Sequence, residues 1–294
     1  MSGEAAFYFV DVFAEHPLTG NPLALIPDAD DLDEARMRAI AREFNQSETT
    51  FVVRPTLPAA HVRLRSFTPA GFEVGGAGHN ALGAWIWLDA AGRLPAGERL
   101  LFQQEIAGES LPVEVIRTAG EPTVIWMDQS APEFGATVTD RGELAACLSL
   151  AEEDLVASQE PRVVSTGASH LLVPVRDRAS VDRAQPDTAR LARLLREAGG
   201  EGCYVYSEGT DGAVAYARFF NPTVGIVEDP ATGTAAGPLV ARLATEGAVK
   251  DGATVVVAQG HALGRPSRIQ VSITGQRVRV GGSGLVVAEG TVRL

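Results

Sequence analysis

An imperfect internal duplication is the feature that most constrains the fold of this chain. The motif RSFTP at residues 65–69 is echoed by RFFNP at residues 218–222, 153 positions later. Each copy is followed by an acidic residue and then by a turn of small residues, at 75–79 and 229–234, that leads into an apolar helix. The alternative is a chance match, because the motif is short. The duplication predicts two similar lobes, each with a helix that begins at a glycine turn.

The remainder of the chain reads as mixed β-sheet with a few amphipathic helices. Residues 5–13 are apolar and aromatic, and apolar residues alternate with polar ones over 269–280, as in half-buried strands. Apolar side chains recur at helical spacing over 33–44 and again over 191–198, where Gly199 ends the second helix. This mixture predicts a protein of the α+β class.

Composition and charge exclude several classes of protein. Hydrophobic residues make up 45% of the 294 positions, enough for a large core, and the net charge of −12 repels nucleic acids and anionic membranes. The two cysteines, Cys147 and Cys203, cannot form a disulfide framework and lack the spacing of a zinc site, so we expect both to be buried without function. No secretion signal and no apolar run of about 18 residues is visible. We therefore expect a cytoplasmic protein with no nucleic-acid partner, membrane segment or metal.

The two glycine turns are candidate anion sites. They precede predicted helices at about residues 80–89 and 234–245, and a helix N-terminus presents unpaired N–H groups with partial positive charge. Gly78 and Gly233 would allow a ligand to approach the backbone closely. If the lobes face each other, the two helix starts would converge on one small carboxylate. The alternative is that these glycines only permit close packing of helix against sheet.

Few side chains near such a pocket could move protons: Glu48, His79, Asp229 and the hydroxyls of Ser47 and Thr234. Glu48 lies at the junction of the first amphipathic helix and an apolar strand, where partial burial would raise its pKa toward neutrality. Taken singly, each residue has an ordinary explanation. A glutamate in a loop is commonly solvated, His79 could be a satisfied polar residue, and Asp229 could be a helix N-cap.

Five segments together identify the chain as similar to a known family. They are PLTGNPLAL (17–25), DADDLDEARMRAIAREFNQSETTFV (28–52), RSFTPAGFEVGGAGHNALGA (65–84), FFNPTVGIVEDPATGTAAGPL (219–239) and QGHALGRPS (259–267). Over essentially its whole length the chain resembles the PhzF-like isomerases, named for phenazine biosynthesis. The resemblance implies a diaminopimelate-epimerase-like fold: two pseudo-symmetric lobes, each a curved sheet or barrel around a central helix, with the active site between them. We expect lobes of residues 1–126 with a C-terminal strand at about 284–294, and of residues 127–283.

The resemblance also implies roles for individual residues. Glu48 would be the general acid and base, with His79 and Asp229 as catalytic companions. The substrate would be bound by Ser47, Gly78, Gly233 and Thr234. The resemblance further implies a homodimer that uses neither a metal nor an organic cofactor.

Three departures from related sequences bear on the expected reaction and its substrate. Cofactor-independent epimerases of this fold carry a thiol before each of the two glycines, where this chain has Ala77 and Thr232, so proton transfer by a single carboxylate is favoured over inversion of a stereocentre. Family members commonly have phenylalanine and proline in the first turn, where this chain has Gly76 and Asn80, and serine in place of Thr234.

We therefore expect a double-bond shift in a small carboxylate. The candidate substrate is trans-2,3-dihydro-3-hydroxyanthranilate or a related intermediate of secondary metabolism. A non-catalytic binder of small acids and, more weakly, a thiol-dependent epimerase are the alternatives.

Overall fold

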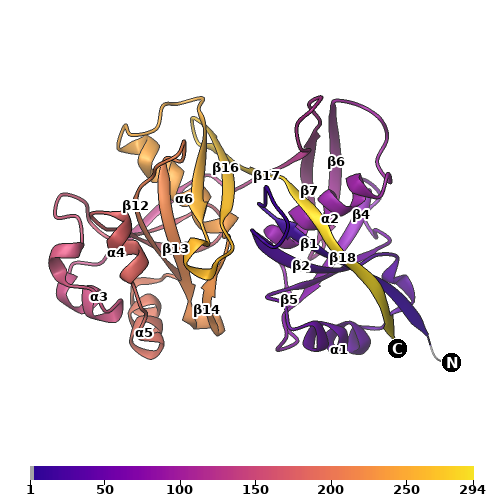
Figure 1. Ribbon diagram of the computed structural model, residues 1–294, viewed down its shortest axis with the longest axis horizontal. Coiled ribbons are helices and arrows are strands. Elements are labelled where there is room, and N and C mark those ends of the chain that lie inside the picture. The colour runs from indigo at the N-terminus through magenta and orange to yellow at the C-terminus, as the bar shows by residue number, and fades with distance from the viewer. Residues whose placement is uncertain (1–2) are drawn as a thin grey trace. The chain divides into compact units, whose positions relative to one another are not determined.

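The computed structural model describes residues 3–294, which divide into two compact units (Figure 1). The first unit extends to Met127 and also includes Gly281–Leu294 at the end of the chain. The second unit is the continuous segment Asp128–Val280. The C-terminal segment thus returns to the unit in which the chain begins.

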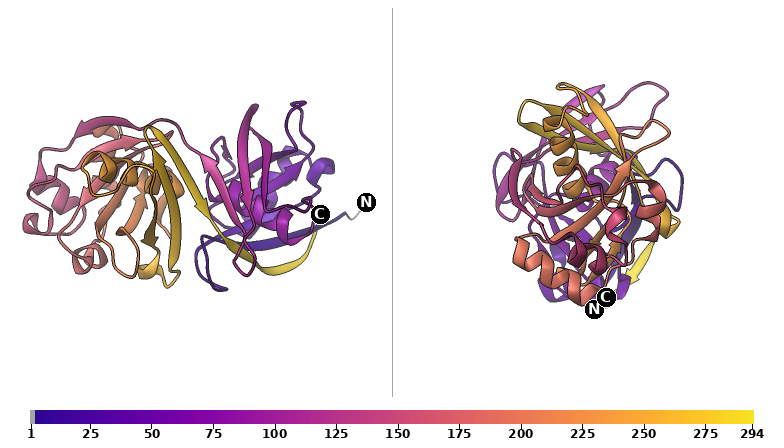
Figure 2. Two further views of the ribbon diagram at one scale, coloured as in Figure 1. Left: turned by 90° about the horizontal axis from the view of Figure 1, so that it is seen from above. Right: turned by 90° about the vertical axis from the view of Figure 1, so that its left-hand side faces the viewer.

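The first unit is a curved, mixed sheet with two helices. Its strands are β1 (Glu4–Val12), β2 (Asn21–Ile26), β3 (Thr49–Val53), β4 (Val62–Phe67), β5 (Glu73–Val74), β6 (Arg99–Ile106), β7 (Glu109–Ile116), β8 (Val124–Asp128) and β18 (Gly284–Arg293). Its helices are α1 (Glu34–Phe44) and α2 (His79–Ala90), with a short 3₁₀ turn, η1 (Ala29–Asp31). Strand β18 pairs antiparallel with β1, and Figure 2 shows the two running side by side.

The second unit has the same general composition and more helices. Its strands are β9 (Glu133–Thr137), β10 (Arg162–Ser165), β11 (Ser169–Pro174), β12 (Gly202–Glu208), β13 (Ala215–Asn221), β14 (Ile226–Asp229), β15 (Thr254–Gln259), β16 (Ser267–Thr274) and β17 (Arg277–Gly282). Its helices are α3 (Arg141–Cys147), α4 (Arg178–Arg183), α5 (Thr188–Ala198) and α6 (Gly233–Thr245), with 3₁₀ turns η2 (Glu152–Asp154), η3 (Pro222–Val224) and η4 (His261–Leu263).

Strand pairing repeats between the two units. In the first, β1–β2 is antiparallel, β2–β3 parallel, β3–β4 antiparallel, β4–β6 parallel and β6–β7 antiparallel. In the second, β10–β11, β11–β12, β12–β13, β13–β15 and β15–β16 follow the same sequence of directions. The predicted α+β class with two pseudo-symmetric lobes is therefore confirmed.

The duplicated motif has the same structural role in both units. Arg65 on β4 binds Glu73 on β5 through two hydrogen bonds of 2.7 and 2.8 Å. Arg218 on β13 likewise binds Glu228 on β14, at 2.9 and 2.7 Å. Each bidentate pair joins a core strand to the short strand that precedes the central helix. This equivalence argues against a chance match between the two motifs.

The two central helices, α2 and α6, are buried on almost every side. All residues from His79 to Leu88 are buried in α2, and Figure 1 shows α6 among the strands of its own unit. Such helices need a close approach to their neighbours. A Cβ on Gly83 would lie 2.5 Å from Leu23 Cδ2, and one on Gly237 would clash with the side chain of Gln129. Close packing therefore explains why a residue without a side chain is needed at Gly83 and Gly237, each about one turn inside its helix.

The amphipathic helices agree with the sequence pattern. Helix α1 buries Met37, Ile40 and Ala41, and α5 ends at Gly199, whose φ of 75° suits glycine. Cys147 and Cys203 are free and buried, as expected. No helix in the described part of the chain is both long and apolar enough to cross a bilayer.

Candidate functional site

Glu48 lies where the chain turns from α1 into β3. Helix α1 ends because Asn45 adopts a left-handed conformation, with φ of 50°, that asparagine tolerates well. Three residues later, the side chain of Glu48 is 19% exposed, and its Oε2 atom lies 3.7 Å from Nδ1 of His79. The helix-to-strand junction therefore holds a carboxyl group beside an imidazole.

The environment of Glu48 favours its neutral form. Its Oε2 atom is buried and has no hydrogen-bond partner among the described residues. Burial disfavours the charged carboxylate and raises the pKa of Glu48 from 4.5 to about 7. A carboxyl group with this pKa is present in both protonation states near neutral pH, as a group that takes and returns a proton requires.

His79 connects Glu48 to a hydroxyl group. It is the first residue of α2, and its side chain is 10% exposed. Its Nε2 atom lies 3.3 Å from Ser47 Oγ, while its Nδ1 atom faces Glu48. The structure therefore brings together three of the residues singled out in the sequence.

The glycine turn before α2 is braced by Asn80. Gly78 is the N-cap of the helix, and its N–H donates to Asn80 Oδ1 at 2.7 Å. Asn80 Nδ2 donates to Gly76 O at 3.0 Å and to Ser66 Oγ at 3.1 Å. In the sequence, Asn80 is notable only because family members commonly have proline at this position. A substrate carboxylate at Gly78 would compete with Asn80 for this N–H.

Asp229 belongs to a network at the start of α6. It is the last residue of β14, it is 8% exposed, and its Oδ2 accepts a short hydrogen bond from Thr232 Oγ1. The N-cap of α6 is Thr232, so the alternative that Asp229 is itself the cap is wrong. The chain needs two further residues, Pro230 and Ala231, to turn from strand into helix.

Gln259, which the sequence analysis did not single out, organises this network. It is fully buried at the end of β15, and its Nε2 donates to Asp229 O at 2.7 Å and to Thr232 Oγ1 at 3.1 Å. Its Oε1 accepts from Tyr204 OH at 2.8 Å and from Thr232 N at 3.2 Å. Gln259 is the first residue of the QGHALGRPS segment, and the resemblance of that segment to the family is the sequence feature that could have identified it. The next residue, Gly260, has φ of 81°, and a Cβ there would collide with the carbonyls of two neighbouring segments.

The first turn of α6 carries Gly233 and Thr234. The carbonyl of Gly233 accepts from Gln129 Nε2 at 3.1 Å, and Thr234 Oγ1 lies 3.3 Å from His170 Nε2. His170 on β11 is 2% exposed, and its Nδ1 has no partner among the described residues. Burial lowers the pKa of His170 to about 4, so its imidazole is neutral at physiological pH. No motif pointed to His170, because a histidine in an apolar strand carries no signal of its own.

Each unit carries polar groups with a chemistry of its own. The first unit supplies Glu48, a carboxyl group that can exchange a proton near neutral pH. The second unit has the start of α6, where Thr234 carries a hydroxyl group. The N–H groups of Ala235 and Ala236 are the first to donate within the helix, and both bond to Thr232 O. The N–H groups of Gly233 and Thr234 therefore take no part in the helical hydrogen-bond pattern. In residues 3–294, no three His, Cys, Asp or Glu side chains are grouped as metal ligands would be.

The chain matches the family model described as phenazine biosynthesis-like protein (PhzC-PhzF) over residues 10–290. It is 33% identical over 293 residues to a trans-2,3-dihydro-3-hydroxyanthranilate isomerase of Pseudomonas chlororaphis, with 98% of this chain and 99% of the relative covered.

Solved structures show the same fold. A phenazine biosynthesis protein of the PhzF family from Bacillus anthracis superposes with a TM-score of 0.92, at 28% identity and 99% coverage of both chains. A hydroxyproline epimerase from Agrobacterium vitis superposes with a TM-score of 0.65 at 14% identity, covering 99% of this chain and 91% of the other. The second likeness concerns the fold alone.

Proposed function

This chain belongs to the phenazine biosynthesis-like family of isomerases, and on that premise we propose that it shifts a double bond in a small carboxylate, with Glu48 moving the proton. One observation carries the proposal. Glu48 is a largely buried carboxyl group whose pKa of about 7 lets it act first as a base and then as an acid.

The proposed reaction is a proton transfer within one substrate. The ionised Glu48 removes a proton from a carbon next to the π-system, and the electron pair of that C–H bond spreads into the conjugated system. The protonated Glu48 then returns the proton to another carbon of the same system. No electrons are gained or lost overall, so the reaction needs neither oxidant nor reductant. His79, 3.7 Å from Glu48, would orient the carboxyl group, and Ser47 would fix the imidazole from its other side.

The resemblance to PhzF-like isomerases, and not the placement of the two units, leads us to assign substrate binding to the start of α6. N–H groups in the first turn of a helix stabilise a carboxylate and the negative charge that develops when the proton leaves. Gly233 leaves room for a close approach of the substrate to the backbone. Asp229 would bind a polar group of the substrate, and its hydrogen bond from Thr232 fixes its orientation.

His170 would position the hydroxyl of Thr234. Its Nδ1 has no partner in the part of the chain that the structure describes, and the imidazole is neutral because burial lowers its pKa to about 4. We assign the ring proton to Nε2, because a proton on Nδ1 would be a buried donor without an acceptor. Nε2–H then donates to Thr234 Oγ1, which leaves the hydroxyl proton of Thr234 free to donate to the substrate.

The first substrate to examine is trans-2,3-dihydro-3-hydroxyanthranilate, because a relative covering the full length bears that name. The turn before α2 argues for a broader panel. It contains Gly75 and Gly76, and its conformation depends on Asn80, so the surface it presents need not match that of the relative.

The positions of the cysteines argue against a thiol-dependent epimerase. Cys147 lies on α3 and Cys203 on β12, and neither precedes α2 or α6. Both are buried, and burial raises the pKa of both thiols, to about 11 for Cys147. Ala77 and Thr232 occupy the positions where paired thiols would be needed. A non-catalytic binder of small acids would have no need for a carboxyl group with a pKa near 7.

The test compares the wild type with Glu48→Gln and Asp229→Asn in the conversion of trans-2,3-dihydro-3-hydroxyanthranilate, followed by NMR and absorbance. A panel of small unsaturated amino acids is assayed in parallel. Loss of turnover in Glu48→Gln with retained binding supports the proposal, and weaker substrate binding in Asp229→Asn supports the role assigned to Asp229. Full activity of Glu48→Gln would refute it, and binding without turnover of any compound by the wild type would favour the non-catalytic binder.

A further inference from the structure

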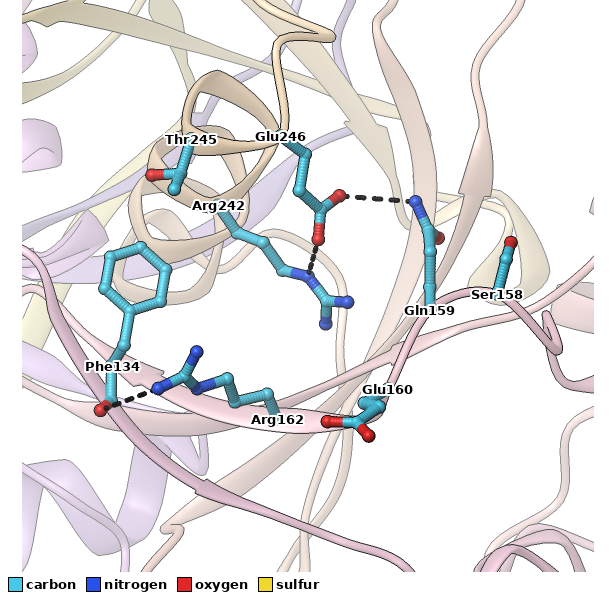
Figure 3. A pocket seen from close by; sticks show the side chains of 8 residues that line it. All are labelled: Phe134, Ser158, Gln159, Glu160, Arg162, Arg242, Thr245 and Glu246. Carbon is cyan, nitrogen blue, oxygen red and sulfur yellow. Dashed lines mark hydrogen bonds and ion pairs between the residues drawn. The ribbon is translucent and has the colours of Figure 1, made fainter.

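A polar pocket lies in the second unit, near the C-terminal end of α6. It has a volume of about 470 Å³ and is bordered by β10, α6 and the segment around Gln159 (Figure 3). Its residues take no part in the proton transfer proposed above. Two arginines, Arg162 from β10 and Arg242 from α6, extend their guanidinium groups toward the space between them.

Arg242 is a buried cation with only part of its hydrogen-bonding capacity used. It is 5% exposed, and its Nε donates to Glu246 Oε1 at 2.8 Å. The other oxygen of Glu246 accepts from Gln159 Nε2 at 3.2 Å. Nη1 of Arg242 is buried and has no partner among the described residues. A guanidinium remains protonated at any physiological pH, so this buried donor is unsatisfied unless another group reaches it.

Arg162 is fixed in place by neutral groups. Its Nε donates to Gly135 O at 3.0 Å and its Nη2 to Phe134 O at 3.2 Å. The guanidinium also lies over the ring of Phe134, 5.2 Å from the centroid. In the described part of the chain Arg162 forms no ion pair, although Glu160 borders the same pocket. Its orientation is therefore set by backbone carbonyls and an aromatic ring, with no carboxylate of the described residues within ion-pair distance.

A second unsatisfied polar atom adjoins the pocket. The hydroxyl of Tyr206 is buried without a partner in residues 3–294, and it borders a neighbouring cavity that shares Ser158 and Gln159 with this one. Burial raises the pKa of Tyr206 to about 12, and the positive charge of Arg242 acts in the opposite direction. Tyr206 is therefore a protonated donor within electrostatic range of Arg242.

We propose that this pocket binds a small organic monocarboxylate, held between Arg162 and Arg242. Glu246 pairs with Arg242, and Glu160 also borders the pocket, so the lining carries two positive and two negative charges. The ligand would therefore be held by directed hydrogen bonds from Nη1 of Arg242 and from Arg162, not by an excess of positive charge. A planar carboxylate matches the fork of a guanidinium better than a spherical ion does. The ring of Phe134 and the methyl group of Thr245 provide an apolar surface for the rest of the ligand. A dianion such as phosphate would place excess negative charge beside Glu246 and Glu160.

The proposal is tested on the full chain by isothermal titration with sodium benzoate at constant ionic strength, with inorganic phosphate as the competing anion. Arg162→Gln and Arg242→Met should each weaken benzoate binding by about tenfold or more, because each removes a charge-assisted contact. Tyr206→Phe should weaken it less. The control is Arg193→Gln, which removes a side chain on α5 that is 61% exposed and should leave binding unchanged.

Loss of Arg242 leaves Glu246 without its partner and can impair folding. The double variant Arg242→Met/Glu246→Gln therefore accompanies it, and the thermal unfolding of every variant is recorded. Arg162→Gln should retain the isomerase turnover of the wild type while it loses benzoate affinity, which separates the pocket from the proposed isomerase site. Absence of saturable binding, unchanged affinity in Arg162→Gln, or tighter binding of phosphate than of benzoate would each overturn the proposal.

Discussion

Replacing Glu48 by glutamine should stabilise this protein above neutral pH while it removes the proposed catalytic group. Burial raises the pKa of Glu48 from 4.5 to about 7, so its carboxylate is held in the folded state at a free-energy cost. Between these two values the folded chain retains a proton that the unfolded chain releases. Stability therefore falls as the pH rises from about 4.5 to 7, and glutamine, which does not ionise, removes this dependence.

The magnitude follows from the size of the shift. One pKa unit corresponds to about 1.4 kcal/mol, so the ionised carboxylate lowers the free energy of unfolding by about 3 kcal/mol at pH 8. At pH 5 the same relation gives about 1 kcal/mol, because the folded group is then protonated. The difference in stability between Glu48→Gln and wild type should therefore grow by about 2 kcal/mol between pH 5 and pH 8.

Urea unfolding at several pH values, followed by tryptophan fluorescence, measures this difference. The three tryptophans, Trp85, Trp87 and Trp126, all lie in the first unit, so their emission reports on the unit that contains Glu48. Glu109→Gln, at an exposed position on β7, is the matched control and should show no such growth. Parallel pH profiles for Glu48→Gln and wild type would show that Glu48 is not desolvated and would refute the reasoning.

Three further outcomes are expected. The kcat/KM of the wild type should rise about tenfold per pH unit below pH 7 and level off above it, because Glu48 ionises there. A flat pH–rate profile would argue against a carboxylate base. Gly83→Ala should lower the free energy of unfolding by about 1–3 kcal/mol in the same urea assay, because its Cβ would lie 2.5 Å from a leucine side chain. Gly76→Ala should change this free energy little, because no non-neighbouring atom of the described residues lies within 4 Å of a Cβ there. Arg218→Met should lower the free energy of unfolding by about 3–5 kcal/mol, because it leaves the buried carboxylate of Glu228 unpaired. Arg65→Met should lower it by less, because Glu73 is more exposed. Equal losses of stability in the two variants on thermal unfolding would contradict this.

Local patterns in the sequence were sufficient for the longer amphipathic helices and for the repeat, whereas α3, α4 and many of the strands were not predicted. Amphipathic spacing located α1 and α5, and the duplicated motif anticipated two lobes whose strand pairing proved equivalent. These features are readable because helical periodicity and a bidentate arginine–carboxylate pair leave marks within a few residues. The position of Glu48 at a helix-to-strand junction was visible for the same reason.

The supporting residues could not be predicted in this way. Gln259 bonds Asp229 and Thr232 across about 30 positions of sequence, and His170 reaches Thr234 across 64. Contacts at such separations depend on strand pairing and leave no local pattern. Asn80 was seen only as a departure from related sequences, whereas its side chain determines the geometry of the turn at Gly78.

The central claim is that Glu48 transfers a proton between two carbons of one substrate. Its most direct test is solvent-deuterium incorporation in heavy water, with wild type and Glu48→Gln incubated with trans-2,3-dihydro-3-hydroxyanthranilate and the panel of unsaturated amino acids, and deuterium located by NMR. The account predicts deuterium at the carbon that receives the proton in the wild type and none with Glu48→Gln. Equal incorporation by both proteins would contradict it.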